Sequence, residues 1–472
     1  MKLTFIDLFA GCGGLSLGLM QAGHQGVLAV EKAAHAYATL DANLVARSVD
    51  GRSFSWPQSI PRQAHDIASL LKDHREAIAS LNGKVDLVVG GPPCQGFSVY
   101  GKRKPNDFRN TLYRRYLDFV KIVNPRAVIL ENVEGINMPF ADKRSNSPRR
   151  TVNTAALRIQ NQLKSLGYGS IALRLCASRY GAPQIRPRFF IVAIKNADKR
   201  SLEIAVDDEF LEKIRSQHLQ AIGLDLNTIV STKDAISDLE INDRERISCP
   251  DSKGFEQAAY QGPKTAYQHA MRGGMENITP PNSIRLPKHA PTTIDKFRLI
   301  QKKGNPGHKI SSELRAELGT AKFRIHWLGA NRPAPTITTL PDDFVHYSEP
   351  RILTVRECAR LQTFPDWFDF HGKYTTGGEL RKTDCPRYTQ VGNAVPPRLA
   401  RFLGTYIQEL LAIDIAFKDE SLRTSSNSSK VAIFEQRADC TMRTTALTDQ
   451  SGNVQDGPVD QARVLVVDQC MA

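Results

Sequence analysis

Cys94 stands in the segment GGPPCQGFS (residues 90–98), directly after an apolar run of the sequence. Two prolines fix the backbone just before the thiol, and glycines flank the unit. A thiol held in this way is suited to be a nucleophile, and the basic stretch that follows it would favour the reactive thiolate. None of the eight cysteines forms a CxxC pair, which excludes a zinc site of that kind.

Two further segments carry polar groups that could assist a nucleophile. Glu131 directly follows the apolar run 127–130. Burial of a carboxyl group at such a place is costly unless the group is paired or has a catalytic role. Glu131 is therefore either a helix cap or a candidate acid. Gln184, Arg186 and Arg188 alternate in an extended segment and so share one face. These two arginines could bind a carbonyl or phosphate group, or form surface ion pairs.

A glycine-rich turn, DLFAGCGG (residues 7–14), follows the first apolar run. Such a turn lets the backbone approach a nucleoside closely. Ser16 occupies the third glycine position of the dinucleotide fingerprint, so a dehydrogenase site is excluded. Glu31 lies 20 residues after Gly11, where it could accept from ribose hydroxyls. We expect a nucleoside cofactor without a pyrophosphate; the alternative is a tight turn that only packs a helix on a strand.

The elements that position these residues alternate between strands and helices. Short apolar runs at 3–9, 27–30, 85–89, 127–130 and 189–194 are separated by helix-like stretches. This order predicts an open, mostly parallel α/β sheet. Ligands bind beyond the carboxyl ends of such strands. The candidate residues follow those ends, so we expect them to form one site.

The 472 residues and the net charge of +14 indicate several domains and a polyanionic partner. Two basic blocks, 102–188 and 261–332, are separated by an acidic one, 196–260. We expect a catalytic and cofactor-binding domain at 1–195, a loop-rich domain at 196–353, a return segment at 354–418, and a linker and tail at 419–472. The sequence contains no membrane helix or signal peptide, which predicts a cytoplasmic protein.

Six motifs resemble those of the DNA cytosine-5 methyltransferases, of the bacterial restriction-modification type. In the family's order they are DLFAGCGG, GGPPCQGFS, ENV (131–133), QIRPR (184–188), RECARLQTFP (356–365) and QVGNAVPP (390–397). The resemblance implies the Rossmann-like fold of S-adenosylmethionine-dependent methyltransferases. That fold has a mixed, mostly parallel sheet, and the loop-rich domain becomes the target-recognition domain.

The resemblance also implies roles for individual residues, with S-adenosyl-L-methionine as methyl donor and no metal. The expected cofactor-binding residues are Phe9, Ala10, Gly11, Gly13, Glu31, Asp66, Ile67, Asn393 and Ala394. The expected catalytic residues are the nucleophile Cys94, the acid Glu131, and Arg188 with Arg186 beside it. The expected DNA-binding residues are Arg103, Arg109, Gln184 and Thr336. Lys32 departs from the family, because several relatives carry an aromatic residue there to cover adenine.

These roles imply methylation of carbon 5 of a flipped cytosine in double-stranded DNA, through a covalent Cys94 adduct. We expect a monomer that acts in a restriction-modification system, with a cognate endonuclease as its functional partner. Two alternatives stay open. A tRNA cytosine-5 methyltransferase shares the chemistry, although its recognition region is usually shorter. A catalytically silent DNA-binding regulator would not need Cys94.

Overall fold

The structure is a computed structural model that describes residues 1–93, 112–138, 154–276, 278–376, 384–438 and 464–465. Side chains of the last long helix are described as far as Arg423. Cys94, Arg103 and Arg109, which we expected at the catalytic site and on DNA, lie outside the described residues.

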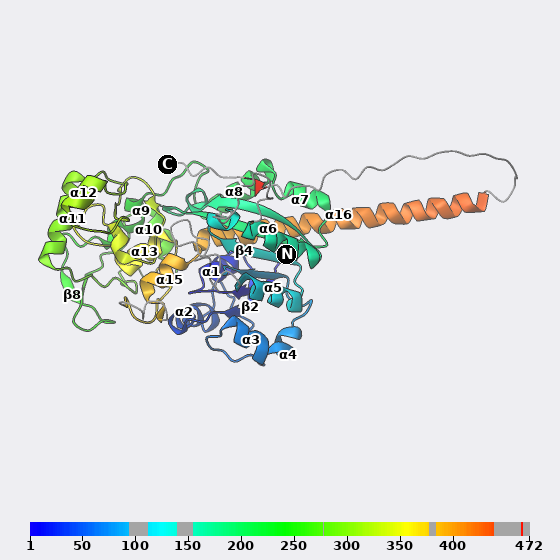
Figure 1. Ribbon diagram of the computed structural model, residues 1–472, viewed down its shortest axis with the longest axis horizontal. Helices are drawn as coiled ribbons and strands as arrows, with labels where there is room; N and C mark the ends of the chain where they lie inside the picture. The colour runs from blue at the N-terminus through cyan, green and yellow to red at the C-terminus, as the bar shows by residue number, and fades with distance from the viewer. Residues whose placement is uncertain (94–111, 139–153, 277, 377–383, 439–463, 466–472) are drawn as a thin grey trace, which may run out of the picture.

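One mixed sheet forms the centre of the larger part of the molecule (Figure 1). Its strand order in the described chain is β13-β5-β7-β4-β3-β1-β2. Strand β7 runs antiparallel to β4 and β5, and the other pairs are parallel. The predicted mixed, mostly parallel sheet is therefore confirmed. Its strands are β1 (Thr4–Leu8), β2 (Gln25–Val30), β3 (Leu87–Gly90), β4 (Ala127–Asn132), β5 (Tyr168–Cys176), β7 (Pro187–Lys195) and β13 (Val464–Leu465).

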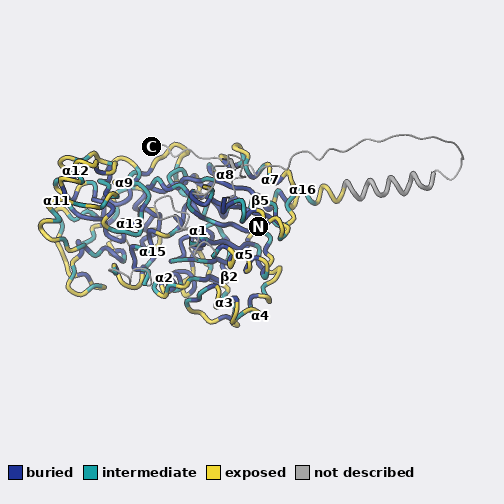
Figure 2. The backbone as a smooth tube through the Cα atoms, in the orientation of Figure 1, coloured by how far each residue is buried: buried dark blue, intermediate teal, exposed yellow. Residues whose placement is uncertain are grey.

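Helices cover both faces of this sheet, because successive strand side chains point to opposite faces. In β1, Phe5 packs into one core with α1 and α16, whereas Ile6 packs into another core with α3, α5 and α6. Figure 2 shows the buried residues concentrated along these strands. The elements of this part are α1 (Gly14–Gln21), α2 (Ala34–Leu40), η1 (Asp41–Val45), α3 (Ile67–Asp73), α4 (Arg75–Ala79), α5 (Leu112–Val123), η3 (Glu134–Asn137), α6 (Ala155–Ser165), η4 (Ala177–Tyr180) and β6 (Gln184–Ile185).

The loop-rich region expected at 196–353, called the recognition region below, contains short elements around a small core of its own. Phe297, Ile300, Leu314 and Ile325 belong to that core. The chain then returns to the catalytic domain through β11, which pairs in parallel with β6. The elements here are α9 (Thr232–Ile236), η5 (Ser237–Leu239), β8 (Arg246–Ser248), β9 (Glu256–Ala258), α10 (Ala266–Met271), α11 (Pro291–Lys303), α12 (Ser312–Glu317), β10 (His326–Trp327), β11 (Ala334–Pro335), η6 (Pro341–Asp343) and β12 (Phe344–Val345).

Two helices at the start of the expected recognition domain pack on the catalytic domain instead. Helix α8 (Asp208–Gln220) buries Leu211 and Ile214 in the same core as α16, and α7 (Lys199–Ile204) precedes it. The Tyr406 hydroxyl donates to the Ala205 carbonyl at 2.6 Å, which joins α16 to this segment. These two helices of the expected recognition domain are thus joined to the return segment.

The return segment comprises α13 (Val355–Leu361), α15 (Arg387–Asn393) and α16 (Pro397–Ala438). Helix α16 projects from the body of the molecule (Figure 1) and runs through the Ser/Thr-rich segment expected to be a linker. Beyond it, β13 adds to the sheet edge at β5. In the described chain, no helix combines the length and apolar character needed to cross a membrane.

Candidate active site

Glu131 and Arg188 meet at the carboxyl end of β4. Antiparallel pairing sets Glu131 opposite Phe190, so Arg188 lies close by on β7. Arg188 Nε is 2.9 Å from Glu131 Oε1, and the two side chains are only 11 % and 15 % exposed. A charge-assisted pair of this kind holds both groups in a defined orientation. The structure thus brings together the predicted acid and the predicted carbonyl-binding arginine.

The backbone that leads to Cys94 passes against this pair. A Cβ atom on Gly91 would lie 2.7 Å from Glu131 Oε2, so only glycine allows this close approach. The Asn132 side chain also donates to the Pro92 carbonyl at 3.2 Å. Contacts from β4 therefore hold the segment Gly91–Pro92 beside the Glu131 carboxylate, just before the sequence reaches Cys94.

Gln184 and Arg186 lie in the joint between the two domains. The Gln184 amide is fully buried, donates to Leu361 O and Gln362 Oε1, and accepts from the Ile337 amide. We expected Gln184 on DNA; instead its side chain is enclosed by the protein, and this expectation is corrected. Burial and three hydrogen bonds hold it there.

Arg186 is also buried and binds backbone carbonyls of the segment after β11 and of the return segment. Its guanidinium donates to Ile337 O at 3.0 Å, Gly392 O at 2.9 Å and Ala394 O at 3.0 Å. These bonds supply hydrogen-bond donors to backbone carbonyls in the protein interior. We expected Arg186 at the substrate beside Arg188. Its observed bonds make it a positioning residue for α15 and the segment that follows.

The glycine-rich turn lies where β1 ends. Gly11 and Gly13 have positive φ values of 56° and 94°, and Phe9 shares this left-handed backbone with φ 60°. The Gly11 amide donates to Glu31 Oε2 at 2.9 Å, and the Ala33 amide donates to Glu31 Oε1 at 2.7 Å. Burial raises the pKa of the Glu31 carboxyl, while these backbone bonds oppose the shift.

This turn fits a nucleoside cofactor. Among the described residues, no atom lies within 4 Å of a Cβ built on Gly11, so there is open space in front of the turn. Each oxygen of a carboxylate can accept more than one hydrogen bond. Glu31 therefore retains acceptor capacity for ribose hydroxyls.

The adenine side of the expected cofactor site is lined by a charged pair. Asp66 caps α3 by accepting from the Ala68 amide at 3.0 Å, and its other oxygen lies 3.1 Å from Lys32 Nζ. The Ile67 side chain is buried in the core beneath the sheet. Lys32 is thus tied to Asp66, at the position where an aromatic ring was expected from the family.

The segment QVGNAVPP (390–397) packs against the same glycine-rich turn. A Cβ on Gly14 would lie 2.4 Å from Val395 O and 3.2 Å from Ala394 Cβ. Asn393 is exposed and Ala394 is half-buried at the end of α15. The structure thus brings the late motif against the start of α1, next to Ala10 and Gly13, although the two motifs lie far apart in the sequence.

Asp7 is a buried acid that the sequence analysis did not single out. Ser16 Oγ donates to Asp7 Oδ2 at 2.6 Å, whereas Asp7 Oδ1 has no hydrogen-bond partner in the described part of the chain. Burial raises the pKa of Asp7 to about 7, although the hydrogen bond from Ser16 opposes the shift. In the sequence, the signal that could have identified Asp7 is an acid inside an otherwise apolar strand. The residue that donates to it, Ser16, is the one that breaks the dinucleotide fingerprint.

Thr336 follows β11, and its hydroxyl donates to Ile185 O at 2.7 Å. The side chain is half-buried. Nearby, in the recognition region, Phe323 is 47 % exposed, and Lys309 Nζ and the Arg324 guanidinium lie 5.2 and 5.3 Å from its ring centre. Exposed aromatic and cationic groups of this kind suit a nucleic-acid surface.

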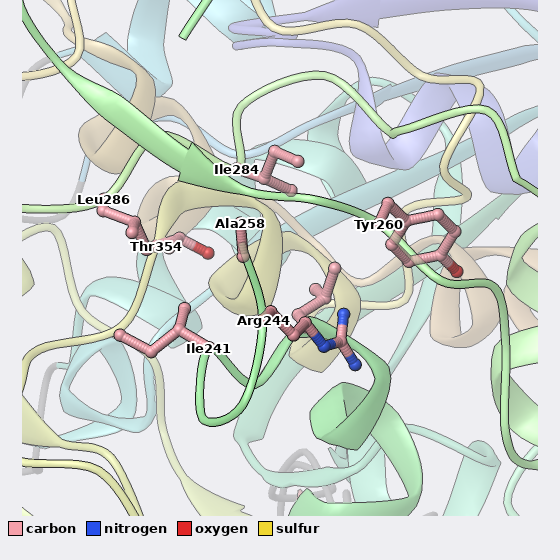
Figure 3. A pocket seen from close by; sticks show the side chains of 8 residues that line it. Ile241, Arg244, Ala258, Tyr260, Ile284, Leu286 and Thr354 are labelled. Carbon is pink, nitrogen blue, oxygen red and sulfur yellow. The ribbon is translucent and has the colours of Figure 1, made fainter. Parts of the chain in front are cut away.

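A small pocket lies within the recognition region (Figure 3). It is lined mainly by apolar side chains together with Arg244, Tyr260 and Thr354. Its described lining includes none of the predicted catalytic or cofactor-binding residues, so it is separate from the Glu131 site. The described residues also contain no group of three His, Cys, Asp or Glu side chains able to hold a metal ion.

Comparisons with known proteins agree with this geometry. Residues 3–409 match the C-5 cytosine-specific DNA methylase family. The chain is 30 % identical to the Type II methyltransferase M.DdeI of Desulfomicrobium norvegicum over 421 residues, which are 86 % of this chain and 88 % of the relative. It is also 30 % identical to M.XorII of Xanthomonas oryzae pv. oryzae, over 91 % of this chain and 92 % of the relative.

A solved structure supports the same fold. A prophage-encoded DNA modification methyltransferase of Escherichia coli is 25 % identical, with a TM-score of 0.57. The similarity covers 87 % of this chain and 100 % of that one. The family match spans every predicted site residue from Phe9 to Ala394.

Proposed function

Because this chain belongs to the C-5 cytosine-specific DNA methylases, we propose that it methylates carbon 5 of cytosine within a short sequence of double-stranded DNA. The observation that carries this proposal is the Glu131–Arg188 pair against the backbone that enters Cys94. Similarity to two Type II methyltransferases supports a role in a restriction-modification system. A cognate endonuclease would then act on the same sequence, and the methyltransferase would act as a monomer.

S-adenosylmethionine supplies an electrophilic methyl group when it is bound. The open space at Gly11 and the acceptor capacity of Glu31 support a nucleoside at the turn. Asp66 would contact the adenine side, while Asn393 and Ala394 would close the pocket. Phe9, Ala10 and Gly13 would complete its wall.

Carbon 5 of cytosine is a poor nucleophile, so the ring must be activated. The Cys94 thiolate would add to carbon 6, forming a carbon–sulfur bond and pushing an electron pair toward carbon 5. Glu131 would donate a proton or hydrogen bond to ring nitrogen 3 and so disperse the charge. Arg188 would hold the cytosine carbonyl oxygen while it keeps Glu131 oriented. After carbon 5 is methylated, loss of its proton to solvent would expel the thiolate.

A cytosine stacked inside a duplex cannot reach these groups, so the base must be flipped at a cost of about a few kcal/mol. Basic residues would supply the binding energy by contacting phosphates, and base-edge contacts would supply the specificity. Arg103 and Arg109 lie in the basic stretch after Cys94 and are proposed to contact DNA near the flipped base. Thr336 is proposed as a contact to the DNA backbone.

The test is expression in a host that lacks cytosine methylation, followed by bisulfite sequencing of its DNA and tRNA. Wild type should methylate one short DNA motif, and Cys94→Ser should abolish this. Cys440→Ser is the matched control, because residue 440 lies outside the family match, and it should behave as wild type. Methylation of tRNA alone would replace the DNA assignment. DNA binding with no methylation from wild type would indicate a silent regulator.

The covalent step has its own measurement. A duplex with 5-fluorocytosine at the target should trap a denaturation-resistant complex, because fluorine cannot leave as the proton does. Wild type and Cys440→Ser should form this complex, whereas Cys94→Ser should not. A trapped complex with Cys94→Ser would contradict the proposed nucleophile.

A further inference from the structure

The recognition region binds the side chain of Arg387, the first residue of α15. This helix is labelled between α13 and α2 in Figure 1. Arg387 Nη1 lies 2.6 Å from Asp251 Oδ2 and donates to Ser283 Oγ at 3.0 Å. The Arg387 side chain is only 9 % exposed, so its charge depends on this carboxylate for compensation. Asp251 and Ser283 both come from the recognition region, whereas Arg387 comes from the return segment.

Stacked side chains reinforce this contact. The Tyr374 hydroxyl donates to both Asp251 oxygens, at 2.9 and 3.0 Å. The Arg285 and Arg387 guanidinium carbons lie 3.8 and 4.2 Å from the Tyr374 ring centre, and Arg285 also lies 4.0 Å from Phe255. We call this set, Asp251, Phe255, Arg285, Tyr374 and Arg387, the Asp251 brace.

The rest of α15 is fixed to the catalytic domain. Gln390 Oε1 accepts from Thr39 Oγ1 at 2.7 Å, which ties the helix to α2. Arg186 binds the carbonyls of Gly392 and Ala394, and Ala394 approaches Gly14 beside the cofactor turn. A helix of this length spans only about 10 Å, so Arg387 and Asn393 are the two ends of one short element.

We propose that Asp251 is a positioning residue through which the recognition region sets the affinity of the cofactor pocket. This inference rests on the proposed function, because it assigns α15 to the wall of the S-adenosylmethionine site. Asp251 holds Arg387, and Arg387 sets the start of the helix that ends at Asn393. Loss of the carboxylate leaves a buried guanidinium without its counter-charge, so the start of α15 shifts. Coupling of this kind is reciprocal, and DNA held by the recognition region strengthens cofactor binding by the same factor as cofactor strengthens DNA binding.

Isothermal titration of the full-length protein with S-adenosylhomocysteine, without DNA, tests this inference. The Asp251→Asn variant should bind about tenfold more weakly than wild type, the scale of losing one charge-assisted hydrogen bond. Asp295→Asn is the matched control, since Asp295 pairs with Arg298 on an exposed face of α11 with 66–70 % of both side chains exposed. This control should bind as wild type does, and Asp251→Glu should recover part of the affinity.

A second readout separates positioning from general stability. Target duplex should tighten cofactor binding by wild type, and this enhancement should shrink in Asp251→Asn at a temperature well below its Tm. If Asp251→Asn does not fold, Tyr374→Phe removes one neutral donor to Asp251 and should give a smaller shift in the same direction. Wild-type affinity in both readouts for the folded variants would overturn the inference. Failure of wild type itself to bind S-adenosylhomocysteine would instead count against the proposed cofactor.

Discussion

At the scale of single residues, two neighbouring arginines bind different kinds of partner. Arg188 pairs with the Glu131 carboxylate at the end of β4. Arg186, two residues earlier, instead donates to the backbone carbonyls of Ile337 and Gly392. The same residue type therefore orients a carboxylate at one position and joins distant segments of backbone at the other. The partner that the fold brings to each guanidinium makes the difference.

Asp7 should make stability depend on pH. Burial raises its pKa to about 7, against an ordinary value of 3.8. Between these values the folded protein binds a proton that the unfolded chain does not, so this contribution is full in acid and is lost as pH rises toward 7. Asp7→Asn, which stays neutral, should gain about 3 kcal/mol relative to wild type between pH 5 and pH 8.

Urea unfolding of wild type and Asp7→Asn at the two pH values measures this change. Asp118→Asn is the control, because its carboxyl on α5 is 52 % exposed. It should not alter the difference between the two pH values. A constant offset between Asp7→Asn and wild type at both pH values would show that Asp7 titrates near its ordinary pKa.

At the scale of elements, the apolar runs of the sequence predicted β1, β2, β3, β4 and β7. Buried strands contain nearly continuous Val, Ile and Leu, which the sequence displays directly. Glu131 and Arg188 lie at the ends of two such strands, β4 and β7, so their proximity could be expected from the sequence. Strand β5 was not singled out by its apolar pattern.

The joint between the domains could not be predicted in the same way. The alternation of side chains along an extended segment placed Gln184 and Arg186 on one face. This local pattern does not show which distant segment of the chain covers that face. The segment of α8 was assigned to the recognition region because the strand–helix pattern weakens after residue 195, whereas Leu211 and Ile214 pack this helix against α16. A weakened local pattern does not show which distant helix a segment will pack against.

Gly91, directly after β3, sets how closely the backbone that precedes the proposed nucleophile Cys94 approaches Glu131. Gly91→Ala places a Cβ atom 2.7 Å from Glu131 Oε2, a carboxylate that Arg188 holds in place. Either this carboxylate or the backbone at residue 91 must move, and displacements of about 1 Å at reacting groups typically cost about a hundredfold in rate. We expect kcat to fall by about that factor, with little change in S-adenosylhomocysteine affinity.

Single-turnover methylation and ligand titration of purified Gly91→Ala check this separation. Gly273→Ala is the matched control, since its nearest neighbour in the described chain, Ala270 O, would lie at an ordinary 3.6 Å. That control should retain the wild-type rate. Near wild-type turnover by Gly91→Ala would mean that the approach of Gly91 to Glu131 is not needed for catalysis.

At the scale of the whole molecule, charge is distributed to match a polyanion. The chain carries a net charge of +14, and its basic blocks flank the acidic segment that includes α7 and α8. Those helices pack on α16, away from the exposed Phe323 with its neighbouring Lys309 and Arg324. The first part of the acidic segment thus packs on α16, while the second basic block lies in the recognition region.

This distribution predicts where binding should depend on salt. Each phosphate contact contributes about 0.9 to the slope of log affinity against log salt concentration. Removing exposed Lys309 by Lys309→Gln should therefore weaken duplex binding and reduce the magnitude of the slope by about 0.9. Lys199→Gln is the matched control, because Lys199 is 84 % exposed on α7 in the acidic segment. Fluorescence anisotropy over a range of salt concentrations measures both slopes. Equal slopes for the two variants would place the DNA on another face, whereas a reduced slope for Lys309→Gln alone would assign it to the surface around Phe323.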